Sequence, residues 1–284
     1  MTINQHYLLG KDHPDPTKYQ VQSLDQSAAI SIASVVTVKQ KSHNLANNED
    51  ASGIYRDEKK TIMMVADAHW GYNASHEAVL RFPNCLEKNS TQADSLKIAF
   101  EQVYLNAIME LSLDLQKSRP RSSERITPDG ASASNTQFHS FVQVGQEYYW
   151  VGMGDCYSAV IRDDSIEVLT SKNSHITLGS LIPNIFMRPD RNAAGLELTA
   201  VMDYDNPLVR NGIDVRKLDL HQNDIFFMCS DGFKINDSTI KKRFNLPQLF
   251  KEKAVPDVLD YLLDTIIKER LSRDNVTFAA MRIK

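Results

Sequence analysis

Residues 61–71 read TIMMVADAHWG, an apolar run that ends in an aspartate and a turn. A short continuous apolar run such as 61–66 is typical of a strand that is buried in a core. Because Asp67 follows it directly, we expect the Asp67 carboxylate at the mouth of a core strand rather than in open solvent. Several other stretches of the chain repeat this arrangement, in which an apolar strand ends beside an acidic residue.

Five acidic sites show the pattern, each beside a different apolar run: Glu49-Asp50, Asp67, Asp155, Asp231 and Asp274. A single aspartate of this kind is usually a turn residue. If the five strands are neighbours, however, the carboxylates converge, and such a cluster is stable only around cations. No Cys or His cluster accompanies them, so the oxygen ligands favour Mg²⁺ or Mn²⁺. Two such ions that share a carboxylate commonly activate water against a phosphate ester.

The remaining patterns predict an α+β fold with an antiparallel core. Residues 91–117 and 256–270 carry apolar stripes at helical spacing. The order of helices and strands does not alternate, which favours α+β over a parallel sheet. The stretch 171–211 has no clear period, and a connection of this length is typical of a lid or binding loop. Short strands are predicted at 28–38, 61–66, 138–144, 148–153, 158–162, 166–169, 213–220, 225–229 and 276–283.

The composition limits the class of protein. The 284 residues are 42% hydrophobic and 24% charged, as in a folded globular chain. A net charge of −4 gives no overall attraction to nucleic acid or to an anionic membrane. The three separated cysteines predict neither a disulfide framework nor a zinc site. Without a secretory signal or a membrane-spanning run, we expect a cytoplasmic monomer, and export by a route that uses no cleaved signal stays open.

An ordered set of short motifs resembles the metal-dependent protein phosphatases of type 2C. The motifs are NED at 48–50, ADAHWG at 66–71, GASAS at 130–134, GMGDC at 152–156, SDG at 230–232 and DN at 274–275. The resemblance spans residues 28–284 and implies a divergent, bacterial-like member. It implies a four-layer α-β-β-α sandwich, in which two antiparallel sheets are flanked by helices and the metal ions lie at one end. We expect residues 1–27, which are polar, to form an arm packed on this domain.

The resemblance also implies a set of metal ligands: Glu49, Asp67, the carbonyl of Ala68, Asp155, Asp231 and Asp274. In this set Asp67 bridges two ions, and Asp155 helps to hold a third, looser ion together with Asp231. Asp50 and Asn275 are expected to support the ligands rather than to bind metal themselves.

The implied activity is the direct hydrolysis of phosphoserine or phosphothreonine in a phosphoprotein, by a water activated between two metal ions. No covalent phosphoenzyme is needed. His69 lies two residues after Asp67, and a general-acid role toward the leaving oxygen competes with a purely structural one. Residues 171–211 would make most of the contacts that recognise the substrate.

Some positions depart from the family pattern. Leu45 stands where the family has the arginine that grips the substrate phosphate, and leucine cannot replace a guanidinium fork. Trp70 also replaces a small glycine beside the site. These departures predict a slow rate or an unusual substrate, and they leave open a pseudophosphatase that only binds a partner. A nucleotide or nucleic-acid hydrolase and a nucleotide-binding enzyme are less favoured, because there is neither a basic stripe nor a glycine-rich loop before a helix.

Overall fold

The computed structural model describes residues 3–35, 48–68, 72–96, 99–117, 136–169 and 215–284. The predicted lid at 171–211, the GASAS motif, Leu45, His69 and Trp70 lie outside these residues. No helix within the described ranges has the length and apolar character needed to cross a membrane.

Two antiparallel sheets of six strands each form the centre of the molecule. The order of the first sheet is β1 (Asn4–Leu9), β4 (Asp50–Arg56), β5 (Lys60–Ala68), β6 (Thr136–Val144), β7 (Glu147–Met153) and β10 (Arg216–Leu218). The order of the second sheet is β2 (Tyr19–Asp25), β3 (Ala28–Ala33), β12 (Val276–Arg282), β11 (Ile225–Cys229), β8 (Tyr157–Arg162) and β9 (Ser165–Leu169). A single 3₁₀ turn, η1 (Gly10–Asp12), follows β1.

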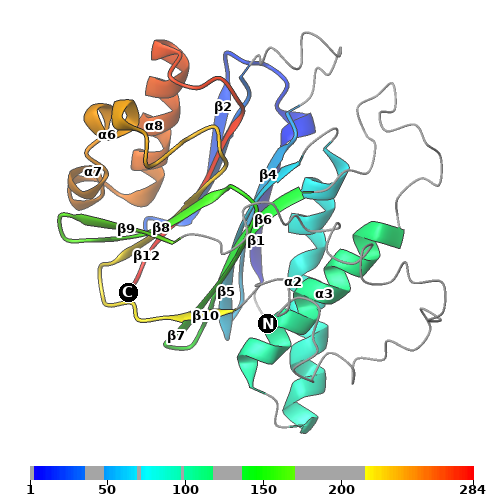
Figure 1. The fold of residues 1–284 in the computed structure, drawn as a ribbon. Coiled ribbons are helices and arrows are strands. Elements are labelled where there is room, and N and C mark those ends of the chain that lie inside the picture. The colour runs from blue at the N-terminus through cyan, green and yellow to red at the C-terminus, as the bar shows by residue number, and fades with distance from the viewer. Residues whose placement is uncertain (1–2, 36–47, 69–71, 97–98, 118–135, 170–214) are drawn as a thin grey trace.

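Helices cover the outer face of each sheet (Figure 1). The long helices α2 (Asn73–Leu96) and α3 (Phe100–Lys117) pack on the first sheet. The second sheet is covered by α6 (Ser238–Arg243), α7 (Leu246–Glu252) and α8 (Val255–Glu269). The predicted four-layer α-β-β-α sandwich is therefore confirmed.

Helix α8 shows how the local sequence produces one of these layers. It begins with a proline in its first turn and ends where Arg270 takes the left-handed conformation, with φ 53°. Val258, Leu262 and Ile266 are buried on one side of it, as the helical spacing predicts. The predicted helix at 256–270 differs from α8 by one residue at each end.

Strand alternation decides which side chains enter the space between the sheets. On β5, Met63 and Val65 belong to the cluster between the two sheets, whereas Ile62 and Met64 face the helices. Successive side chains of a strand point to opposite faces, so Asp67 follows Met63 and Val65 toward the interior. The same alternation on β4 places Asp50 on the side of Ile54. These aspartates lie at one end of the sandwich.

Some predicted elements need correction. Residues 1–27 were expected to form an arm, but β1 and β2 lie within them and form one edge of each sheet. Their side chains are mostly exposed or half-buried, which weakens the apolar pattern that a sequence reveals. The predicted helix 91–117 joins two elements, because α2 ends at Leu96 and α3 starts at Phe100. Strand β4 was not predicted.

Candidate metal centre

Two of the acidic residues face each other across neighbouring strands. Asp50, the first residue of β4, is the direct antiparallel partner of Asp67 near the end of β5. Only 2% of Asp50 and 7% of Asp67 is exposed. Facing residues on adjacent strands have close side chains. The fold therefore brings two carboxylates together inside the sandwich.

Asp231 and Asp274 come from the second sheet. Asp231 follows β11 and Asp274 precedes β12, and these strands are paired. The turn after Asp231 packs closely on the other loop, because a Cβ at Gly232 would lie 1.9 Å from the carbonyl oxygen of Asn275. Only glycine allows this approach. The Ser272 hydroxyl lies 2.8 Å from the carbonyl oxygen of Gly232 and 2.7 Å from that of Asp274, so it holds both loops together.

The pKa shifts of the buried aspartates reflect the nearby carboxylates of the other sheet. Burial raises the pKa of Asp67 well above its ordinary value, and the charges of Asp50, Asp231, Asp274 and Asp155 raise it further. Burial likewise raises the pKa of Asp50 to about 8; the Ser230 hydroxyl opposes this rise, whereas Asp274 and Asp231 add to it. These are the effects expected of buried groups with like charges around them.

Asp155 is exposed and reaches the cluster from the turn after β7. Gly154 holds this turn with φ +87°, a conformation that favours glycine. The backbone N–H of Asp155 donates to the side-chain carbonyl oxygen of Gln137 at 2.9 Å. Gln137 is in turn the strand partner of Asp67 on β6. One buried glutamine thus ties the Asp155 turn to the strand that carries Asp67.

Glu49 and Ala68 lie together at the open ends of β4 and β5. The backbone N–H of Ala68 donates to the carbonyl oxygen of Glu49 at 3.4 Å, and the hydroxyl of Ser75 on α2 contacts the same oxygen. The hydroxyl of Thr136 lies 3.0 Å from the carbonyl oxygen of Asp67. The half-buried Glu49 is therefore placed beside the end of the strand that carries Asp67.

Asn275 acts through two different groups. Its backbone N–H donates to Asp274 Oδ1 at 2.9 Å and so contacts the neighbouring carboxylate. Its side-chain oxygen instead accepts from the backbone N–H of Val35 at 3.1 Å, just after β3. The side chain of Asn275 thus anchors the loop to the second sheet.

Residues that sequence reasoning missed support the centre. Buried Asn48 accepts from the backbone N–H of Asp50 at 2.9 Å and donates to the carbonyl of Ala33 at 3.2 Å, which links the two sheets. Its position in the NED motif was a signal that could have identified it. Ser230 likewise lies in the SDG motif, whereas Gln137 carries no such local signal, because it reaches the cluster only through strand pairing.

The donor set fits a hard divalent cation. All the candidate side-chain ligands are carboxylates, and Asp50 Oδ2 is buried with no hydrogen-bond partner among the described residues. Within these residues, no three acidic, His or Cys side chains already stand in the geometry of a metal site. Carboxylates repel one another, so a cation would have to draw them together. The residues converge on a common region without closing around one point.

Solved structures of known proteins share this fold. A bacterial serine phosphatase bearing a mutation is 19% identical, with a TM-score of 0.57 over 94% of this chain and 98% of its own. The PPM Ser-Thr phosphatase MsPP from Mycobacterium smegmatis, in complex with cacodylate, is 18% identical, with a TM-score of 0.54 over 91% of this chain and 98% of its own. RsbX in complex with magnesium is 10% identical, with a TM-score of 0.52 over 94% of this chain and 100% of its own.

The sequence by itself matches no protein-family model and no curated protein. The likeness therefore rests on the arrangement of the two sheets and their helices. The chain has the fold of the bacterial metal-dependent Ser/Thr phosphatases of type 2C, as its motifs implied.

Proposed function

We propose that this chain is a divergent type 2C phosphatase that hydrolyses phosphoserine or phosphothreonine in proteins and depends on Mg²⁺ or Mn²⁺. The observation that carries the proposal is the convergence of Asp50, Asp67, Asp231 and Asp274 at one end of a sandwich with this fold. The magnesium complex of RsbX supports the choice of ion.

Each ligand would have a defined place. Asp67, Asp231 and Asp274 would hold two ions with help from Glu49 and the carbonyl of Ala68. Asp155, which is exposed on its turn, would help to hold a third ion. When bound, the ions supply an activated water and neutralise charge on the phosphate.

Other residues keep the ligands in position. The backbone N–H of Asn275 fixes Asp274 Oδ1, and the Thr136 hydroxyl fixes the carbonyl of Asp67. Asn48 holds the backbone of Asp50 against the second sheet. Such supporting contacts typically change metal affinity by about 10- to 100-fold when they are lost.

His69 is the proposed general acid toward the departing seryl or threonyl oxygen, because it follows Asp67 by two residues. The stretch 171–211 is the proposed main contact for the phosphoprotein. We place the chain in the cytoplasm as a monomer; its three free, buried cysteines are consistent with a reducing compartment.

Hydrolysis of p-nitrophenyl phosphate and of a phosphothreonine peptide, in Mn²⁺, in Mg²⁺ and in EDTA, tests the proposal. We expect activity only with metal, and an Asp231→Asn variant that loses it. Asp219→Asn is the matched control, because the Asp219 side chain is 95% exposed and lies near the other end of β11. A folded parent protein without metal-dependent hydrolysis would contradict the proposal and favour the binding module.

A further inference from the structure

A pocket of about 420 Å³ opens beside the carboxylates of the second sheet. Asp231 and Asp274 line it, and so do two basic residues, Lys234 and Arg273. Ile240 on α6 and Leu271 before β12 contribute apolar surface, and the hydroxyls of Thr239 and Ser272 complete most of the lining. A volume in this range accommodates a side chain or a small ligand rather than a single ion.

The two basic residues are available to a ligand. Both are exposed, and neither side chain has a hydrogen bond or ion pair within the described part of the chain. Asp237 also lines the pocket and interacts electrostatically with Lys234, but its carboxylate is already engaged. It accepts from the backbone N–H groups of Thr239 at 2.7 Å and Ile240 at 3.4 Å at the start of α6, and these bonds lower its pKa. The pocket therefore offers two cations next to the acidic centre.

These cations stand apart from the buried carboxylates. Lys234 and Arg273 line a pocket that reaches the centre on the side of Asp231 and Asp274, whereas Asp50 and Asp67 do not line it. Their place fits contact with a residue next to the phosphorylated one.

We propose that Lys234 and Arg273 select phosphoprotein substrates that carry an acidic side chain beside the phosphoserine or phosphothreonine. The carboxylate of that side chain pairs with the ammonium and the guanidinium groups. Its methylene groups pack on Ile240 and Leu271. Asp231 and Asp274, which line the same pocket, belong to the centre that binds the phosphorylated residue. This selection rests on the proposed phosphatase function.

Phosphothreonine peptides that differ only in flanking glutamate, glutamine or lysine test the selection. We expect kcat/KM of the parent for the glutamate peptide to exceed that for the glutamine peptide about tenfold, the size of one favourable charge contact of about 1.4 kcal/mol. In a Lys234→Gln/Arg273→Gln variant this ratio falls to about one. In a Lys234→Glu/Arg273→Glu variant the preference shifts to the lysine peptide.

A Lys241→Gln/Lys242→Gln variant is the matched control, because both lysines are exposed on α6 and do not line the pocket. It should keep the preference of the parent. A parent that hydrolyses the glutamate and glutamine peptides equally, or a Lys234→Gln/Arg273→Gln variant that keeps the preference, would overturn the selection and leave the phosphatase function standing.

A binding measurement separates the two proposals. Fluorescence anisotropy of a labelled glutamate-rich peptide without phosphate needs no catalysis. We expect the Lys234→Gln/Arg273→Gln variant to bind it about tenfold more weakly than the parent, at matched ionic strength. If no peptide is hydrolysed but this difference persists, the phosphatase function fails and the acidic-peptide site stands. Equal binding by parent and variant would overturn the site.

Discussion

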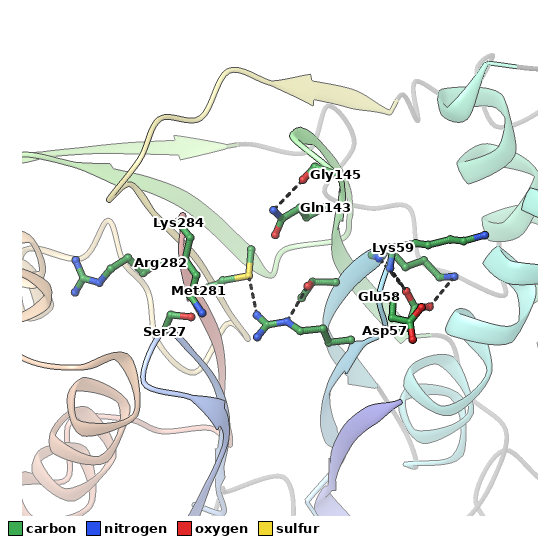
Figure 2. Close-up of a pocket in the computed structure, with 12 residues that line it drawn as sticks. Ser27, Asp57, Glu58, Lys59, Gln143, Gly145, Met281, Arg282 and Lys284 are labelled. Atoms are coloured by element: carbon green, nitrogen blue, oxygen red, sulfur yellow. Dashed lines mark hydrogen bonds and ion pairs between the residues drawn. The ribbon is translucent and has the colours of Figure 1, made fainter. Parts of the chain in front are cut away.

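The two ends of the sandwich differ in the partners of their buried and half-buried carboxylates. At one end, Asp50 and Asp67 lie opposite each other, and burial together with neighbouring aspartates raises the pKa of both. At the other end a pocket of about 310 Å³ lies between the sheets, and Figure 2 shows Asp57 and Lys284 on opposite sides of it. There the acidic groups meet basic partners.

The paired end links the sheets directly. Arg56 on β4 bonds to Asp25 on β2 at 2.8 Å, and Lys284 reaches the same carboxylate at 3.0 Å. Lys60 pairs with Asp57 at 3.1 Å and also contacts Glu87 on α2. Burial by itself would raise the pKa of Asp25, but hydrogen bonds from Ser27, Lys284 and Arg56 lower it below the ordinary value.

The contrast separates structural charge from functional charge. Where each carboxylate has a basic partner, the charges hold the layers together and the native state gains stability. Where carboxylates converge on one another, the native state loses stability unless a cation compensates. The acidic end is therefore the end at which we expect metal, and variants at both ends can test this difference.

The largest expected effect is on turnover. Asp67→Asn keeps the shape of the side chain but removes the charge that would bridge two ions. We predict a loss of more than about 100-fold in kcat/KM for p-nitrophenyl phosphate in Mn²⁺. Replacing a residue that only supports a metal ligand already lowers metal affinity or activity by about 10- to 100-fold. Asp25→Asn, at the paired end, should retain the activity of the parent. Comparable activity in both variants would remove Asp67 from the centre.

A pair of glycines gives the next largest effect. In Gly232→Ala, the new Cβ would lie 1.9 Å from the carbonyl oxygen of Asn275, so the Asp231 and Asp274 loops must move apart. We predict a fall of about 10- to 100-fold in Mn²⁺ affinity, measured by calorimetry.

Gly145 at the paired end is the matched control, since a Cβ there meets no atom within 4 Å. Its φ of +59° makes alanine cost about 1 kcal/mol of stability. Gly145→Ala should therefore bind Mn²⁺ like the parent, and equal Mn²⁺ affinity in Gly232→Ala would disprove the role of the close loop contact.

A smaller effect is expected on the pH dependence of stability. The folded-state pKa of Asp25 is lowered, so the ionised carboxylate stabilises the folded protein above the ordinary carboxyl pKa near 4. This stabilisation is lost as the pH falls toward the lowered pKa. Urea unfolding should show Asp25→Asn about 1 kcal/mol less stable than the parent at pH 7, allowing for solvent screening of a partly exposed pair. The difference should shrink as the pH falls from about 5 to about 2. A difference that stays constant over this range would mean that Asp25 acts through packing rather than charge.

The sequence was most informative where the chemistry is local. The run before Asp67 predicted β5, because a buried strand needs consecutive apolar residues. The apolar pattern did not reveal β1 and β2, because these edge strands leave many side chains partly exposed. The sequence also failed to predict the first three-quarters of α2, where Pro83 and several polar residues interrupt the apolar stripe. Local patterns cannot reveal an element whose burial depends mainly on its partners.

The candidate site follows the same division. Strand ends and family motifs predicted Asp67, Asp231, Asp274 and Asp155, and the structure brings these residues near one another. The contact of Gln137 with the Asp155 turn depends on the pairing of β6 with β5 and on the close approach at Gly154. That pairing joins residues far apart in the chain, and no single segment encodes it. The metal-ligand roles of these four aspartates, of Glu49 and of Ala68 stay predictions, and so does the role of His69, which lies outside the described residues.

Removing one carboxylate from each end, with stability as the readout, tests the contrast most directly. The free energy of unfolding of the parent, Asp67→Asn and Asp25→Asn can be measured in urea at pH 7, in EDTA and in excess Mn²⁺. In EDTA we predict Asp67→Asn to be about 1–3 kcal/mol more stable than the parent, since a buried carboxylate among like charges is removed, and Asp25→Asn to be less stable. Mn²⁺ should stabilise the parent and Asp25→Asn but not Asp67→Asn. An Asp67→Asn variant that is less stable than the parent in EDTA, and that Mn²⁺ stabilises as much as the others, would contradict a metal centre at this end of the sandwich.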